Sequence, residues 1–147
     1  MSFISNHIHF VWSTARREPM IDPAWADRLY AFIGGTLNNE RGKLLAAGGV
    51  EDHIHVLVSL PATLSLADAA SLMKANSSRF IHEEIGAAAF DWQKGYAAFS
   101  VSVSVCDAVR AYIAKQREHH RHRSFQEELI EFLEKHQVPY DPRYVFV

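Results

Sequence analysis

The sequence predicts an α+β fold of the ferredoxin-like (RRM-like) kind, in which two helices cover one face of an antiparallel sheet. The chain has 147 residues, enough for one domain with a sizeable core. Four segments show the alternation of apolar and polar residues that is typical of strands, and two long segments carry apolar residues at helical spacing. Their order along the chain is strand, helix, strand, strand, helix, strand, as in that fold.

The first half of the chain supplies three of these elements. Residues 5–13 alternate as a strand. Residues 23–41 form an amphipathic helix, with Asp22 as its N-cap, Pro23 in its first turn and Gly42 at its end. Residues 43–50 are a second strand, for which Gly48 and Gly49 predict a bulge or turn.

The second half begins with a strand at residues 51–60, which follows so closely that it forms a hairpin with the second strand. A capping box at Ser65 starts a long helix that Gly86 closes. Residues 96–103 alternate loosely and are expected to be the fourth strand.

The remaining residues are mostly helical and end in a short extended tail that starts at Asp141-Pro142. A third helix is expected after Ser104, a break within the basic run 115–123, and a last helix after a capping box that begins at Ser124. We predict one domain over 1–147, with a core at 1–103 and a C-terminal helical part at 104–147. Because the first two helices already cover one face of the sheet, these helices must pack on the open face, at an edge or on a partner subunit.

Two histidines lie on one face of the predicted third strand. Side chains alternate across a strand, so His53 and His55 project from the same side, about 7 Å apart. Two neutral imidazoles at that separation can chelate a metal ion. A His-x-His pattern also arises by chance, and the motif alone favours two half-buried or solvated imidazoles over a metal site.

A tyrosine and a glutamine share a stripe of the third helix. Tyr112 and Gln116 are four residues apart, which places them one turn apart on the same side. Taken alone, they fit a core aromatic and a surface amide. If the helix packs on the open face, they bring a phenol and an amide oxygen to His53 and His55.

Composition excludes some classes of protein. The net charge of −2 argues against coating nucleic acid by bulk electrostatics, although it allows a local basic site. A single cysteine, Cys106, excludes an internal disulfide. We find no signal-peptide pattern and no apolar run of membrane-spanning length, so we expect a cytoplasmic protein without a membrane partner.

Over nearly its whole length, the chain resembles the HUH single-tyrosine transposases of the smallest bacterial insertion sequences, the insertion sequence 200-like group. The motifs that carry the resemblance are Ser13-Thr14 with Arg16-Arg17, Asp52-His53-Ile54-His55, Leu72-Met73-Lys74 with Ser77-Ser78-Arg79-Phe80, Phe99-Ser100-Val101, Tyr112-Ile113-Ala114-Lys115-Gln116, His119-His120, Ser124-Phe125 and Glu128.

The resemblance implies a role for each of the main motifs. His53-Ile54-His55 corresponds to the His-hydrophobic-His motif, Tyr112 to the nucleophile and Gln116 to the third metal ligand. It further implies imperfect DNA hairpins at element ends as partners. It also implies a homodimer, in which each tyrosine helix can serve the partner's histidine pair.

These residues suit a transesterification. Two imidazoles and an amide oxygen favour Mg²⁺ or Mn²⁺, which can polarise a phosphodiester for in-line attack by Tyr112. The products are a 5′-phosphotyrosine and a free 3′-hydroxyl, and the step is reversible. We therefore predict a metal-dependent single-stranded DNA transposase. The alternatives are a domesticated relative acting on repeated palindromes, a non-catalytic single-stranded nucleic-acid binder, and a phosphoesterase that uses water.

The basic residues allow two interpretations. The run around residues 117–123 can follow a DNA backbone, or it can be a solvated helix end at which cations are favourable. The candidate DNA contacts are Arg117, Arg121 and Arg123, with Arg16, Arg17, Lys74 and Arg79 as weaker ones. For the second His-x-His pair, His7 and His9, we predict a structural role and not metal ligation.

Overall fold

A computed structural model describes residues 1–146 and contains a four-stranded antiparallel sheet. The strands are β1 (His7–Ser13), β2 (Lys43–Val50), β3 (His53–Ser59) and β4 (Ala97–Val101). Their order across the sheet is β2-β3-β1-β4, so β1 and β3 are the central pair. This is the predicted ferredoxin-like arrangement, and the fold prediction is confirmed.

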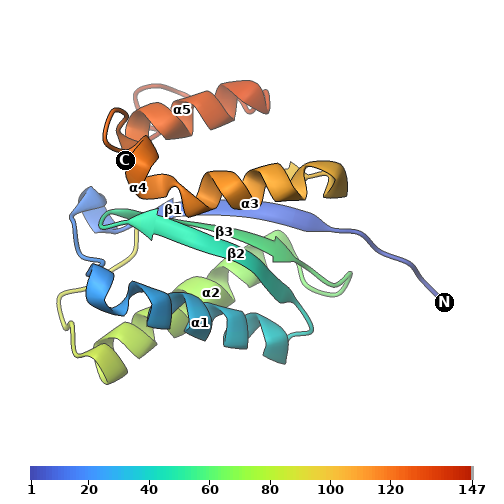
Figure 1. Ribbon diagram of the computed structural model, residues 1–147, viewed down its shortest axis with the longest axis horizontal. Helices are drawn as coiled ribbons and strands as arrows, with labels where there is room; N and C mark the ends of the chain where they lie inside the picture. The colour runs from blue at the N-terminus through green and yellow to red at the C-terminus, as the bar shows by residue number, and fades with distance from the viewer. Residues whose placement is uncertain (147) are drawn as a thin grey trace.

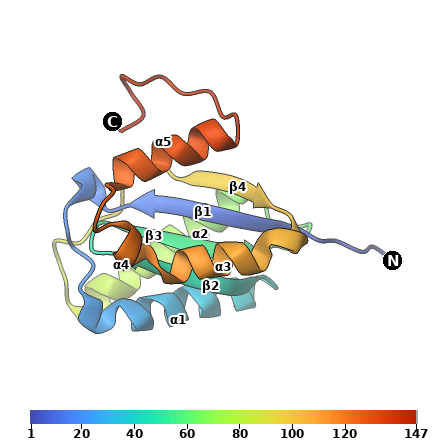
Figure 2. The ribbon, with the colours of Figure 1, turned by 45° about the horizontal axis from the view of Figure 1, so that its top comes forward.

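Helices cover both faces of the sheet (Figure 1). On one face lie α1 (Pro23–Asn39) and α2 (Leu66–Phe80), and on the other lie α3 (Cys106–Ala114), α4 (Gln116–His119) and α5 (Phe125–Lys135). Figure 2 shows α3 along the side of β2 and α5 along the side of β4. The C-terminal helices therefore pack on the face that the first two helices leave open.

The central strands divide their side chains between the two layers. The alternate residues of β1 and β3 that face α1 and α2 are buried in one apolar core, and they are Ile8, Phe10, Trp12, Ile54, Val56 and Val58. The opposite parity contains His9, His53 and His55, all buried, beneath α3, α4 and α5. Pleating thus places the histidines on the side predicted from their spacing.

The irregularity in β2 lies elsewhere than predicted. The pairing of β2 with β3 shifts register between Leu44 and Ala46, whereas Gly48 and Gly49 remain in the ladder. A Cβ atom on Gly48 would lie 2.4 Å from the carbonyl oxygen of Ile113. This glycine is needed because α3 approaches the strand backbone closely, and the bulge prediction was wrong.

The C-terminal helices follow the prediction in outline, with a helix after Ser104 and a break at Lys115, the first residue of the basic run. The third helix begins at Cys106, without a side-chain cap from Val105, and ends at Ala114, so Gln116 opens a separate short helix. The predicted single stripe from Tyr112 to Gln116 is therefore interrupted. The last helix begins after Ser124 with the predicted capping box. Within residues 1–146, no helix combines the length and apolar character needed to cross a membrane.

Candidate active site

His53 and His55 lie at the centre of a buried polar group beneath the C-terminal helices. His120, directly after α4, and Glu128, on α5, complete it. One ligand atom from each of these four residues lies within 4.8 Å of the others. Three of the side chains are fully or almost fully buried, and His120 is largely covered. The fold thus converges three imidazoles and a carboxylate from three elements.

The carboxylate of Glu128 is the meeting point of the three rings. Its Oε1 lies 2.8 Å from Nε2 of His55, 3.2 Å from Nε2 of His120 and 3.5 Å from Nε2 of His53. All three Nε2 atoms therefore face the same small volume. Such a convergence of imidazoles and a carboxylate could hold a cation.

Gln116 lies beside this group despite the helix break. Its Oε1 is 3.1 Å from Nε2 of His53 and 3.1 Å from Nε2 of His120. Its Nε2 is buried without a hydrogen-bond partner within the described residues. The structure therefore brings the predicted amide ligand to the predicted histidine pair, with its oxygen turned inward.

The phenol of Tyr112 reaches the same group within one chain. Its hydroxyl donates to Oε2 of Glu128, the carboxylate oxygen on the far side from the histidines. The guanidinium of Arg123 donates from Nη2 to the phenol oxygen at 3.1 Å and is itself paired with Glu131. The phenol oxygen thus has an anionic acceptor and a cationic donor.

Each histidine of the pair also has a partner behind it. Nδ1 of His53 lies 2.7 Å from Oδ1 of Asp52, and Nδ1 of His55 lies 2.8 Å from Nε2 of His9. Because the Nδ1 atoms are engaged, both Nε2 atoms face the group. His9 reaches His55 diagonally across the β1–β3 ladder, where Val11 pairs with His55.

The two histidines differ in protonation in the metal-free protein. Burial alone would lower the pKa of His53, but hydrogen bonds to Asp52 and Glu128 outweigh it and raise this pKa to about 9. Burial lowers the pKa of His55 to about 4 and of His9 to about 3, and the proximity of these two rings adds to the effect for His9. At neutral pH, His53 is therefore an imidazolium beside the neutral rings of His55 and His9.

The pKa values of Glu128 and Tyr112 shift in opposite directions. Burial would raise the pKa of Glu128, but hydrogen bonds from His120, His53 and His55 hold it well below its usual range. Burial, followed by the hydrogen bond to Glu128, raises the pKa of Tyr112 well above its usual range, although Gln116 and Arg123 oppose this rise. The phenol is therefore protonated at neutral pH.

The donor set fits a divalent cation. Imidazole nitrogens from His53, His55 and His120, a carboxylate oxygen from Glu128 and an amide oxygen from Gln116 all turn inward. Oxygen ligands suit Mg²⁺ and Mn²⁺, whereas imidazoles suit the transition metals. A cation here would replace the proton on His53 as the charge that balances Glu128.

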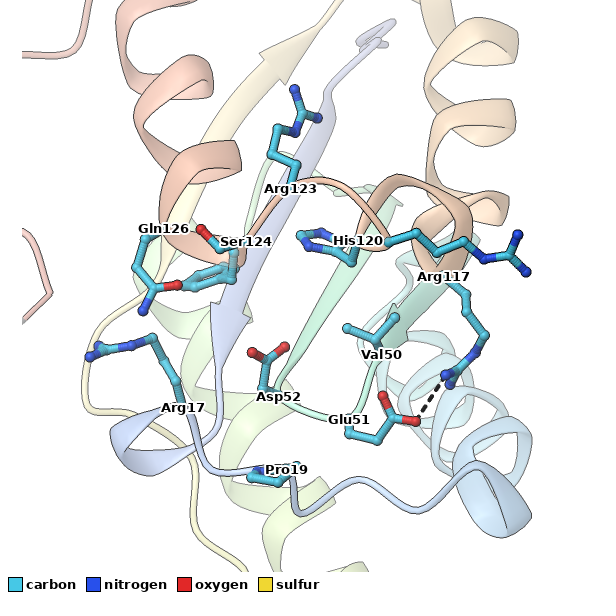
Figure 3. A pocket seen from close by; sticks show the side chains of 12 residues that line it. Arg17, Pro19, Val50, Glu51, Asp52, Arg117, His120, Arg123, Ser124 and Gln126 are labelled. Carbon is cyan, nitrogen blue, oxygen red and sulfur yellow. Dashed lines mark hydrogen bonds and ion pairs between the residues drawn. The ribbon is translucent and has the colours of Figure 1, made fainter.

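A cavity of about 640 Å³ opens beside His120 (Figure 3). Four of the predicted DNA contacts line it, namely Arg17, Arg117, Arg121 and Arg123. In Figure 3, Asp52 and His120 lie toward the middle, Arg17 stands on one side, and Arg117 pairs with Glu51 on the other. This cavity is a basic-walled approach to the histidine group.

The other predicted DNA contacts lie away from this cavity's lining. Arg16 is exposed and paired with Glu18. Lys74 donates to the carbonyl oxygens of Gln93 and Gly95, and Arg79 donates to a neighbouring side chain on the outside of α2. Since α2 covers the opposite face of the sheet, Lys74 and Arg79 are remote from the histidines, and for Lys74 the hydrogen bonds indicate a structural role.

Sequence reasoning assigned no role to His120 or Glu128 and only a structural role to His9. One signal was present for Glu128, which lies three residues after Phe125 and four before Phe132 on the inner stripe of α5. A carboxylate on an apolar stripe indicates a buried partner. His120 follows Gln116 by four residues, so it carried a similar but weaker signal.

Comparison with known proteins decides the family. The model of the family described as IS200-like transposases matches residues 2–116, which is most of the chain. The chain belongs to the IS200-like transposase family. A comparison with curated proteins finds no match.

Two solved transposase structures share the fold of this IS200-like chain. A proposed transposase from Deinococcus radiodurans R1 superimposes with a TM-score of 0.62 at 19% identity, over 79% of this chain and 95% of that one. A REP-associated tyrosine transposase bound to a REP hairpin gives a TM-score of 0.61 at 14% identity, over 82% and 72%. Membership implies DNA strand transfer as the general activity. His120 and Glu128 lie beyond the matched residues.

Proposed function

We propose that this protein cleaves and rejoins single-stranded DNA at hairpin-marked element ends through a 5′-phosphotyrosine on Tyr112. One observation carries the proposal. The Tyr112 hydroxyl contacts the same Glu128 carboxylate that lies against His55 and His120, so nucleophile and ligand set share one buried site. Family membership supports the reaction class.

The chemical step exchanges one phosphodiester for another. The Tyr112 oxygen attacks the phosphorus and loses its proton, the bond from phosphorus to the 3′-oxygen breaks, and the 3′-oxygen takes up a proton. The bond energy is retained in the tyrosyl ester, so the reverse step can join strands without a nucleotide cofactor. Arg123, 3.1 Å from the phenol oxygen, stabilises the negative charge that develops there.

The proposed ligands are His53, His55 and Gln116, supplemented by His120 and Glu128. When bound, a divalent cation supplies Lewis-acid polarisation of the scissile phosphate. Mn²⁺ or Mg²⁺ are the proposed ions, and the three imidazoles favour Mn²⁺. Asp52 and His9 hold the two strand histidines with Nε2 inward.

The DNA backbone is proposed to enter along the cavity beside His120. Arg17, Arg117 and Arg121 line it and can neutralise phosphates. Arg16 is a weaker candidate, and Lys74 and Arg79 could only contact a part of the hairpin that reaches the opposite layer.

Hairpin DNA and a homodimer are the proposed partners. A fold neighbour is bound to a REP hairpin, which supports a hairpin ligand for this chain. Tyr112 reaches the histidines of its own chain, which supports cleavage in cis within each subunit. The same neighbour favours one alternative, a domesticated relative that acts on repeated palindromes by the same chemistry.

Covalent capture tests the proposal. A library of single-stranded hairpins with flanking sequence is incubated with Mn²⁺ or Mg²⁺, and adducts are separated on a denaturing gel. We expect a metal-dependent protein–DNA adduct that is absent in Tyr112→Phe and present in Tyr144→Phe, a control at an exposed tyrosine. Cleavage that persists in Tyr112→Phe would instead support a phosphoesterase that uses water. Binding without cleavage in the wild type would support a plain nucleic-acid binder.

A further inference from the structure

Glu128 joins two functional groups that have no other carboxylate in common. It is 1% exposed and lies on the inner stripe of α5, whose other inner residues are apolar, as Phe125 and Leu133 show. A packing role at this position would be served by an apolar side chain, because a buried carboxylate loses hydration and requires partners.

The two oxygens of Glu128 have separate partners. Oε1 faces the rings of His55 and His120, at 2.8 and 3.2 Å. Oε2 accepts the hydroxyl proton of Tyr112 and lies 3.9 Å from Nη2 of Arg123. One rigid carboxylate therefore spans the distance between the ligand set and the nucleophile.

We propose that Glu128 is a positioning residue that couples cation binding to the placement of Tyr112. Oε1 serves as the anionic ligand, and Oε2 holds the phenol oxygen at a set position relative to the cation. The inference rests on the proposed function and adds that α5, beyond the residues that the family model matches, belongs to the catalytic unit.

The physical basis is restriction of two groups by one side chain. A carboxylate with one oxygen bound to a cation loses rotational freedom, so its second oxygen is confined to fewer positions. The phenol of Tyr112, which donates to this second oxygen, is then oriented before DNA binds. Orienting a nucleophile in advance supplies much of its rate advantage. Gln116, by comparison, turns its amide oxygen to Nε2 of His53 and of His120.

The first experiment uses Mn²⁺ alone and needs no DNA. Ring resonances of ¹³C-labelled tyrosine are followed during Mn²⁺ titration, with Tyr112→Phe to assign the signal, and Mn²⁺ affinity is measured by electron paramagnetic resonance. In the wild type, we expect the Tyr112 signal to broaden as one Mn²⁺ binds. In Glu128→Gln, we expect affinity to fall at least about tenfold and broadening to require correspondingly more Mn²⁺.

Glu134→Gln is the matched control. Glu134 lies on α5, is exposed, and also accepts a tyrosine hydroxyl, from Tyr140 at 3.0 Å. We expect it to keep wild-type Mn²⁺ affinity and Tyr112 broadening. Equal affinity and equal broadening in Glu128→Gln and Glu134→Gln would overturn the proposal.

Glu128→Asp provides a second variant that keeps the charge but shortens the side chain. We expect it to bind Mn²⁺ more nearly like the wild type. Its rate of adduct formation at saturating hairpin DNA should fall about 100-fold, while the DNA concentration for half-saturation stays unchanged. A wild-type rate in this variant would contradict coupling. Failure of the wild type to form any adduct would remove the proposed function, while the Mn²⁺ titration would still decide whether Glu128 links the two groups.

Discussion

The two faces of the sheet bury their side chains in different ways. Toward α1 and α2, the strands contribute to one continuous apolar core with Leu29, Ile33 and Met73. On the opposite face, the apolar residues form two separate clusters, one with Phe125 and one with Ile113, and the polar histidine group lies between them. The comparison shows that one layer buries a continuous apolar core, whereas the other buries less apolar surface and holds the polar histidine group.

The largest expected effect comes from a substitution in the apolar core beneath α1 and α2. Leu29→Ala removes a fully buried side chain from the core under α1. We expect the free energy of unfolding, measured by urea titration, to fall by about 2–5 kcal/mol. The Mn²⁺ affinity of the protein that remains folded should not change. A tenfold loss of affinity in this variant would show that the two layers are not separable.

Acidification should lower the stability of the protein through the buried histidines beneath the C-terminal helices. The pKa values of His9 and His55 are about 3 and about 4 in the folded protein, below the ordinary 6.5. Between pH 6.5 and these lower values, the unfolded chain therefore binds more protons than the folded protein. Stability should therefore fall as the pH drops from 6.5 toward 4, by up to about 2.7 kcal/mol per pH unit.

Above pH 6.5, His53 should make stability fall as the pH rises. The pKa of His53 is about 9, so its contribution is complete below pH 6.5 and is lost as the pH rises through 9. Urea titrations of metal-free protein across this range should show maximal stability near pH 6.5. A flat profile between pH 4.5 and 6.5 would refute this account of the buried rings.

His9→Phe sharpens the comparison within the polar layer. The new ring suits the space beside Phe99 and Phe132 but leaves Nδ1 of His55 without a hydrogen-bond partner. We expect Mn²⁺ affinity, measured by calorimetry, to fall about 10–100-fold. His7→Phe on the same face of β1 has no contact with His55 and is the control. Equal affinity in both variants would mean that His9 only fills space.

The smallest expected effect concerns the rim of the cavity. Arg121→Gln removes one cation from its lining and leaves the buried group intact. Hairpin affinity should weaken modestly, and the slope of log affinity against log salt should decrease by about 0.7. Arg79→Gln, on the outside of α2, should leave this slope unchanged. The reverse pattern would place the DNA on the other layer.

The fold could be predicted from the sequence because each element had its own local signal. Alternation in β1 and β3 set which residues face α1 and α2, and the capping box at Ser124 predicted the start of α5. The bulge in β2 was misplaced because glycine serves two purposes, and here Gly48 admits the backbone near Ile113.

Only part of the candidate site could be predicted from the sequence. His53 and His55 share a strand, so their spacing was informative, and a resemblance supplied Tyr112 and Gln116. His120 and Glu128 come from elements whose approach depends on tertiary packing, which periodicity does not encode. The basic run predicted a helix break, which falls at Lys115, but it did not predict that His120 would meet the histidine pair.

Peptide mapping of the covalent product tests the central claim most directly. Wild-type protein is incubated with Mn²⁺ and hairpin DNA, digested with nuclease and protease, and analysed by mass spectrometry. We predict that the residual nucleotide is attached to the peptide containing Tyr112 and that it disappears in His53→Ala. Attachment to Tyr140 or Tyr144, or a nucleotide on Tyr112 that forms equally without the histidines, would contradict the site described for this protein.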